Sequence, residues 1–112
     1  RLRPAMLVTV SNDASARLWQ VKTGKCLQVL SGHEGAVWHA TFSPDGLLVA
    51  TASFDGTARL WRVETGELVR SLEGHSEAVR HCAFAADRPD LLATASDDSS
   101  ARLWSTRSGE CV

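Results

Sequence analysis

The sequence predicts an all-β fold in which one unit of four short antiparallel strands is repeated along the chain. The motif Asp-x-x-Ala-Arg-Leu-Trp occurs three times and ends at Trp19, Trp61 and Trp104, which are 42 and 43 residues apart. A period of this length indicates an array of one supersecondary unit. The intervening segments lack helical periodicity and hold short runs of strand-forming residues between turn signals. Such units pack as propeller blades, because one unit cannot bury both of its faces alone.

The first copy is predicted to supply three strands, at 5–11, 16–21 and 26–30. The first of these is rich in β-branched and apolar residues, as strands are. Turns are expected at 12–15 and around Gly24, because Asn, Asp, Ser and Gly favour turns. Residues 31–35 then form a loop.

The middle copy is complete, and its predicted strands span 37–42, 47–53, 57–63 and 68–72. Pro44-Asp45-Gly46 is a turn signal, and Asp55-Gly56 is a hairpin signal. The strand at 47–53 mixes Val, Ala, Thr and Ser, and such small residues suit a strand packed on both faces. The third copy repeats this order with strands at 79–84, 91–96 and 100–106. Its turn at 85–90 carries one extra residue, and the chain stops where a fourth strand should begin.

A second marker keeps the same period as the tryptophans. Gly32-His33 and Gly74-His75 precede the second and third tryptophans by nearly equal distances, and the middle copy adds a turn at 42–46. Together these motifs resemble the WD40 repeat family over essentially the whole chain. The departures are small: Gln20, Arg62 and Ser105 follow the tryptophans, where the family often has Asp.

The resemblance implies one β-propeller domain made of three repeats. Residues 1–30 are a repeat without its inner strand, 31–73 are a complete repeat, and 74–112 are a repeat without its outer strand. A ring normally needs about four to eight blades. The incomplete blades at both ends argue against neat closure as a trimer, and the chain starts at Arg1 rather than Met. We therefore expect an incomplete ring that is a segment of a larger propeller and requires the rest of it.

In WD40 proteins a loop His, a strand Ser or Thr, a turn Asp and the Trp often form a hydrogen-bonded tetrad. The resemblance implies the sets His33, Thr51, Asp55 and Trp61; His75, Thr94, Asp98 and Trp104; and the partial set Thr9, Asp13 and Trp19. Ser11, Ser53 and Ser96 are alternatives for the hydroxyl, because they lie two residues further along the same strand face. Indole only donates, carboxylate only accepts, and hydroxyl and imidazole do both, so the tetrad can satisfy its buried polar groups.

Asp, His and Ser or Thr also make up nucleophilic triads. We reject that interpretation here, because the same set occurs twice in register and each has a Trp that occupies the hydroxyl. The sequence has no glycine-rich phosphate loop, metal-ligand cluster or His-x-x-x-His spacing. We therefore expect no catalysis, no metal and no cofactor. His39 and His81 share one repeat position, where they line a channel or, as we favour, are simply solvated or packed.

In the family, the residues that flank the inner-strand Val, and the residue before the turn Asp, tend to face partners. By position these are Ala36, Trp38 and Phe54; Ala78, Arg80 and Asp97; and Asn12. Trp38 is the one Trp outside the repeated position, and Phe54 replaces a residue that is polar in the other copies. Trp and Arg are enriched at interface hot spots. The alternative for Trp38 is packing in the seam with a neighbouring blade.

Composition limits the partner class and the compartment. Net charge is −1, from 12 basic and 13 acidic residues, so general attraction to nucleic acid or anionic membranes is not expected. No apolar run reaches the roughly 18 residues of a membrane span. The repeated Arg17, Arg59 and Arg102 are expected to be structural, on an exposed face beside acidic neighbours. Three cysteines without metal-ligand spacing are expected to be packing residues, which favours a reducing compartment. We expect an intracellular location, cytoplasmic in preference to nuclear, with a ciliary or other complex as an alternative.

The function that the resemblance implies is a non-catalytic scaffold for protein–protein interaction within a multiprotein complex. Two alternatives stay open. One is a regulatory or sensor propeller of a larger signalling or enzyme chain. The other is a module that recognises a phosphorylated or otherwise modified peptide. Fold alone does not decide between them.

Overall fold

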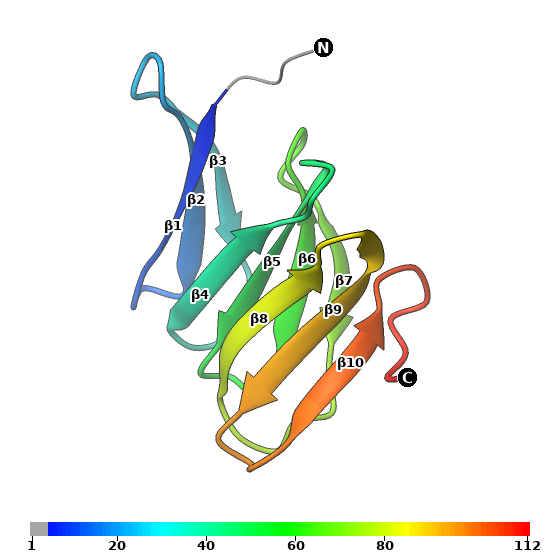
Figure 1. Cartoon of the computed structure of the whole chain (residues 1–112). Coiled ribbons are helices and arrows are strands. Elements are labelled where there is room, and N and C mark those ends of the chain that lie inside the picture. Colours follow the sequence, from blue (N-terminus) through cyan, green and yellow to red (C-terminus); the bar gives the residue numbers. More distant parts are fainter. Residues whose placement is uncertain (1–4) are drawn as a thin grey trace.

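Ten strands and no helix make up the structure, a computed structural model that describes residues 5–112 apart from the side chain of Pro89. They form three antiparallel sheets, one for each copy of the motif (Figure 1). The first sheet contains β1 (Met6–Val10), β2 (Ser15–Gln20) and β3 (Cys26–Ser31). The second contains β4 (Val37–Phe42), β5 (Leu48–Ser53), β6 (Ala58–Arg62) and β7 (Leu68–Leu72). The third contains β8 (Val79–Ala85), β9 (Arg88–Ser96) and β10 (Ala101–Ser105). The predicted all-β blade architecture is confirmed.

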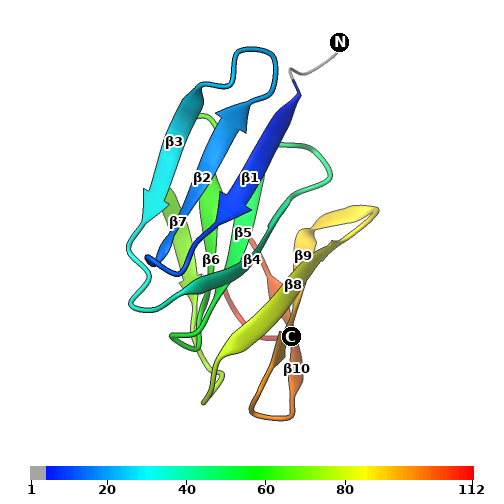
Figure 2. The ribbon, with the colours of Figure 1, turned by 90° about the vertical axis from the view of Figure 1, so that its left-hand side faces the viewer.

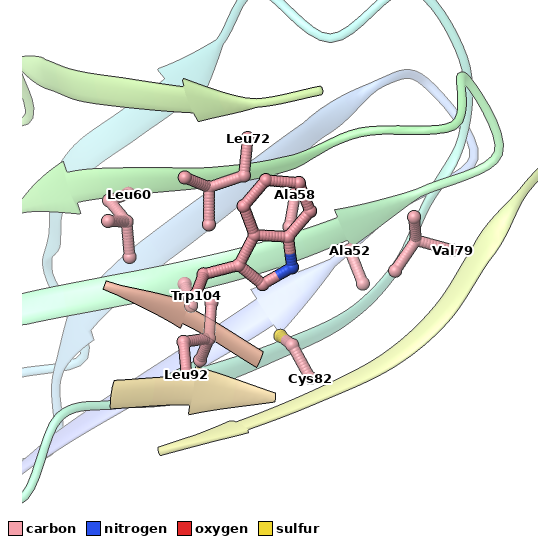
Figure 3. Packing of buried hydrophobic residues seen from close by; sticks show 9 residues of the cluster. Ala52, Ala58, Leu60, Leu72, Val79, Cys82, Leu92 and Trp104 are labelled. Carbon is pink, nitrogen blue, oxygen red and sulfur yellow. The ribbon is translucent and has the colours of Figure 1, made fainter. Parts of the chain in front are cut away.

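The middle sheet lies between the other two sheets (Figures 1 and 2), and two apolar clusters fill the seams. In the seam with the first sheet, Trp61 packs with Ala16, Leu18 and Leu30. In the seam with the third sheet, Trp104 lies beside Ala58 and Leu72, as Figure 3 shows. Trp61 and Trp104 therefore each pack against the sheet that precedes their own.

Strand β5 is central to this stack. Its residues 49–53 are all buried, since one of its faces packs on the first sheet and the other on the third. Small side chains permit this close approach on both sides, as the composition of the strand predicted.

The two outer sheets each leave one face uncovered. Leu7 in the first sheet is 58% exposed, whereas Val49, its equivalent in the middle sheet, is fully buried. Leu103 in the third sheet is 42% exposed, whereas its equivalent Leu60 is fully buried. The sheets thus form an open stack and not a closed ring. No helix that could cross a membrane occurs in the described part of the chain.

The start of β9 differs from the prediction. The turn expected at 85–90 is a tight hairpin, because Ala85 pairs with Arg88. Pro89 has no amide N–H to donate. The pairing of β9 with β10 begins only at Leu91, so Pro89 removes no hydrogen bond between these two strands. At the other end of the third sheet, Cys111 pairs with Trp104 as an isolated bridge. This bridge lies where the fourth strand was expected to begin.

In each copy of the motif, the residue that follows the turn Asp has a backbone φ in the left-handed region. Gly56 has φ 86°, and its equivalents Ala14 and Ser99 have φ 75° and 70°. A side chain at such a φ costs about 1–2 kcal/mol, which glycine avoids. The first and third hairpins therefore carry backbone strain that the middle hairpin lacks.

Ser99→Gly should raise the free energy of unfolding by about 0.5–1 kcal/mol, because relief of the strain exceeds the extra chain entropy of glycine. Chemical denaturation of the protein measures the change. Ser76→Gly is the matched control: its φ is not positive, so the substitution should destabilise by about 0.4–1 kcal/mol. Equal effects at both positions would contradict the assignment of strain to Ser99.

Candidate functional site

A chain of hydrogen bonds crosses the middle sheet. The indole Nε1–H of Trp61 donates to Thr51 Oγ1 at 2.9 Å, and Thr51 Oγ1 lies 2.6 Å from His33 Nε2. His33 Nδ1 lies 2.9 Å from Asp55 Oδ2. The indole can only donate and the carboxylate can only accept, so the protons run in one direction. This order requires the Thr51 hydroxyl to donate to His33, and it requires a neutral His33 that carries its proton on Nδ1.

The third sheet repeats the same geometry. Trp104 Nε1–H donates to Thr94 Oγ1 at 2.8 Å, Thr94 Oγ1 lies 2.7 Å from His75 Nε2, and His75 Nδ1 lies 2.8 Å from Asp98 Oδ2. In the first sheet, Trp19 Nε1–H donates to Thr9 Oγ1 at 2.8 Å. Asp13 does not join that pair; its carboxylate accepts from the amide and hydroxyl of Ser15.

The serines that were alternatives for the hydroxyl do different work. Ser53 Oγ donates to the carbonyl of Ala36 and accepts from the amide of Asp55. Ser96 makes the equivalent contacts with Ala78 and Asp98, and Ser11 Oγ accepts from the amide of Asp13. These serines fix the turns, whereas the threonines receive the indole.

Asp55 organises the loop around it. Its carboxylate accepts from the amides of Glu34 and Thr57, from the Thr57 hydroxyl and from His33. Burial raises the pKa of this carboxyl, but the hydrogen bonds from Thr57, Glu34 and His33 outweigh burial and lower the pKa to about 2. Burial lowers the pKa of His33, and the nearby Asp55 offsets only part of that effect. The buried pair is therefore a neutral imidazole beside a carboxylate.

These groups are placed to hold structure and are not placed for nucleophilic attack. Thr51 and Thr94 are buried, and each hydroxyl already has two partners. Within residues 5–112, no group of three or more His, Cys, Asp or Glu could hold a metal ion. Of the three free cysteines, only Cys82 is buried, which raises the pKa of its thiol to about 12. The expectation of a packing role was wrong for Cys26, exposed at the start of β3, and for Cys111, exposed in the isolated bridge.

Four of the seven residues expected to face partners form one cluster. Trp38 and Phe54 meet edge to face, with ring centroids 5.3 Å apart. The guanidinium of Arg80 lies 4.5 Å from the Trp38 centroid, and Asp97 binds its Nε and Nη2 at 2.7 and 3.0 Å. We call Trp38, Phe54, Arg80 and Asp97 the aromatic–arginine cluster. It bridges the second and third sheets, and Phe54 is 60% exposed.

Two β-bulges create this cluster. The register of β4 against β5 shifts between Val37 and His39, and that of β8 against β9 shifts between Val79 and His81. Trp38 and Arg80 are the extra residues, so neither is tied to a partner on the neighbouring strand. The carbonyls of half-buried Ala36 and buried Ala78 accept from the amides of Phe54 and Asp97, so these two residues support the cluster from below its surface. Asn12 lies apart from it, exposed on the first sheet.

His39 and His81, which share a repeat position, also meet. Their rings stack with centroids 3.9 Å apart and planes 25° apart. Burial, and then the neighbouring His81, lower the pKa of His39, while a hydrogen bond with the backbone of Cys82 opposes this. The two imidazoles therefore link the inner strands β4 and β8 across the seam.

The prediction that the repeated arginines lie on an exposed face beside acidic neighbours was wrong in part. Arg59 and Arg102 are half-buried, and among the described residues neither forms an ion pair. A Cβ built on Gly32 would lie 2.9 Å from Arg59 Nη1, and one on Gly74 would lie 2.8 Å from Arg102 Nη1. The glycine of each Gly-His thus leaves room for the arginine side chain. The sequence carried a signal for this contact, because the glycine and the arginine recur together in the second and third copies.

Comparison with known proteins identifies the repeat. A family model described as "WD domain, G-beta repeat" matches residues 24–62 and 66–105. The F-box-like/WD repeat-containing protein TBL1X of Mus musculus is 44% identical over 41 residues, which cover 37% of this chain and 8% of the relative. WD repeat-containing protein 37 of Mus musculus is 46% identical over 44 residues, or 39% of this chain and 9% of the relative. WD repeat-containing protein pop1 of Schizosaccharomyces pombe is 44% identical over 39 residues, which cover 35% of this chain and 5% of the relative.

Because His33 and Asp55 share one network, their effects on stability should not add. His33→Ala and Asp55→Ala should each lower the free energy of unfolding by about 1–3 kcal/mol, and the double variant should lose less than the sum by about 0.5–3 kcal/mol. Denaturant titration measures the cycle. The control is the double variant of His33→Ala with Asp90→Ala, because Asp90 lies at the opposite end of the blades. Its loss in the free energy of unfolding should equal the sum of the two single losses. Additive losses for His33 with Asp55 would refute the shared network.

Acid should destabilise the fold in two steps. His33 has a folded pKa below its ordinary 6.5, so its contribution is complete above about pH 6.5 and is lost as pH falls through the folded pKa. Asp55 has a folded pKa of about 2 against an ordinary 3.8, so its contribution is complete above about pH 4 and is lost as pH falls toward 2. Melting temperature followed from pH 7 to 2 measures both steps. Asp55→Asn should reduce the lower step; an undiminished lower step would contradict the assignment.

Proposed function

This chain belongs to the WD40 repeat family, and from that premise we propose that it is a non-catalytic scaffold that binds other proteins within a multiprotein complex. WD repeat proteins generally act as protein-interaction scaffolds. The binding surface that we propose is the aromatic–arginine cluster. The buried hydrogen-bond chains hold the blades rigid, and the cluster presents side chains at the end of those blades.

The observation that carries this proposal is an aromatic pair held in one geometry, in which Phe54 is exposed and Trp38 is half-buried. Phe54 is fixed against Trp38, and Trp38 is covered on one side by Arg80, whose position Asp97 fixes. A surface that is ordered before binding loses little entropy when a partner docks. Large aromatic and Arg side chains supply most of the energy at interface hot spots. The cluster has both features.

Recognition of a phosphorylated peptide has less support. Arg80 is the one cation in the cluster, and Asp97 occupies its Nε and Nη2. A phosphate group would have to displace that carboxylate and would remain close to it. A regulatory or sensor propeller of a larger chain is the stronger second candidate, since the matched segments cover 5–9% of the relatives' length.

We extend the proposal to the propeller domain as a whole, to the class of partner and to the cellular location. Repeats at 1–30, 31–73 and 74–112 belong to one propeller domain, and further blades cover the exposed faces that carry Leu7 and Leu103. The partners are proteins, with no role for membranes or nucleic acid. The cellular site is cytoplasmic, which the three free cysteines support.

Phe54→Ser should weaken partner binding by about 30-fold or more, the loss typical of a hot-spot residue, while the fold is kept because the side chain is exposed. Quantitative affinity capture with the wild-type protein and the variant measures the loss, and circular dichroism checks the fold. Leu47→Ser is the matched control, because Leu47 is 53% exposed at the opposite end of the blades. Retention of every partner by Phe54→Ser would contradict the proposed surface.

A further inference from the structure

Acidic residues gather at the end of the blades that carries the aromatic–arginine cluster. Five connecting segments meet at this end, the lower one in Figure 1, and they span 11–14, 32–36, 54–57, 73–78 and 97–100. They hold seven carboxylates and no Lys or Arg: Asp13, Glu34, Asp55, Glu73, Glu77, Asp97 and Asp98. The segments at the opposite end mix both signs, with Lys22, Lys25 and Arg107 among their charges. These connecting segments are therefore acidic, and the cations that reach them come from the strands: Arg59 at Gly32, Arg102 at Gly74 and Arg80 at Asp97.

Two of these carboxylates flank the aromatic pair and are free to bind. Glu34 and Glu77 are exposed, and within the described residues neither forms an ion pair. Glu34 is next to Gly35, where a built Cβ would lie 3.4 Å from Phe54 Cβ. On the other side, the carbonyl of Glu77 would lie 3.4 Å from a Cβ built on Gly56. The turn that carries Phe54 thus approaches two backbone segments, and each of these carries an uncommitted glutamate.

The cation that is already present shows what this surface accepts. Arg80 stacks on Trp38 and forms a two-point ion pair with Asp97. One blade earlier, Trp38 and Phe54 occupy the repeat positions of Arg80 and Asp97, so an exposed aromatic ring stands there in place of a carboxylate. Among the described residues, the ring that carries a stacked cation is Trp38, so the exposed ring of Phe54 is open to a cation of the partner.

We propose that the partner is a protein segment that pairs an apolar side chain with Lys or Arg, a refinement that rests on the proposed interaction function. Its apolar side chain packs on Phe54 and Trp38. Its cations pair with Glu34 and Glu77 and stack on the open face of Phe54. An acidic or phosphorylated segment would meet the uncommitted carboxylates of Glu34 and Glu77, so charge selects against it.

A random dodecapeptide display library, selected on the wild-type protein with the rest of its natural chain, tests the partner class without knowledge of the partner. Selected peptides should combine Lys or Arg with an adjacent apolar residue. The best of these should lose binding to Phe54→Ser and keep it to Leu47→Ser. Glu34→Gln with Glu77→Gln should weaken it about 2- to 30-fold and reduce its salt dependence, as expected for two exposed ion pairs. Glu64→Gln with Glu67→Gln, at the opposite end, is the matched control and should have no effect.

The outcomes separate the refinement from the function on which it rests. Acidic or uncharged peptides that still require Phe54 would overturn the basic partner and leave the interaction surface standing. Basic peptides whose binding is unchanged in Phe54→Ser would show that they bind elsewhere and would overturn both. Binding that requires Phe54 but is unchanged in the Glu34→Gln, Glu77→Gln variant would also overturn the proposed charge pairing. A selection that enriches no peptide would overturn the proposed surface itself.

Discussion

The hydroxyl of Thr51 is the point on which the middle blade depends. It accepts the indole proton of Trp61 and donates to His33, and His33 in turn holds Asp55. These four residues come from β5, β6, the loop before β4 and the β5–β6 turn, so one chain of bonds ties the strands to both connections. Because the groups are buried, loss of any one member leaves the others unpaired, which costs more than the bond that is removed.

The same tryptophan also joins one blade to the next. The polar edge of Trp61 serves the network of its own sheet, and its ring packs on Ala16 and Leu18 of the preceding sheet. Trp104 does this one blade further on (Figure 3). A buried Trp is suited to both tasks, because it offers a large apolar surface and a single donor. Repetition of one residue at a fixed period thus produces both the blade and the stack.

Periodicity predicted much of this and failed where the chain departs from strict repetition. The motif around Trp61 placed the strands, and the two-sided burial of β5 followed from its small residues. Periodicity could not choose between Thr51 and Ser53, because both lie on the same strand face. It also missed the early start of β9 and the shifts that release Trp38 and Arg80, since a β-bulge depends on the pairing of two strands. The gathering of acidic connecting segments was hidden because their carboxylates come together only once the strands alternate in direction.

The proton on His33 tests this account most directly. If Trp61 donates to Thr51 and Asp55 only accepts, neutral His33 must carry its proton on Nδ1 and present Nε2 as the acceptor. The ¹⁵N chemical shifts of the imidazole at neutral pH distinguish the two neutral tautomers. We predict a single Nδ1–H tautomer for His33 and the same for His75. A protonated Nε2, or averaging between the two tautomers, would contradict a continuous chain from Trp to Asp.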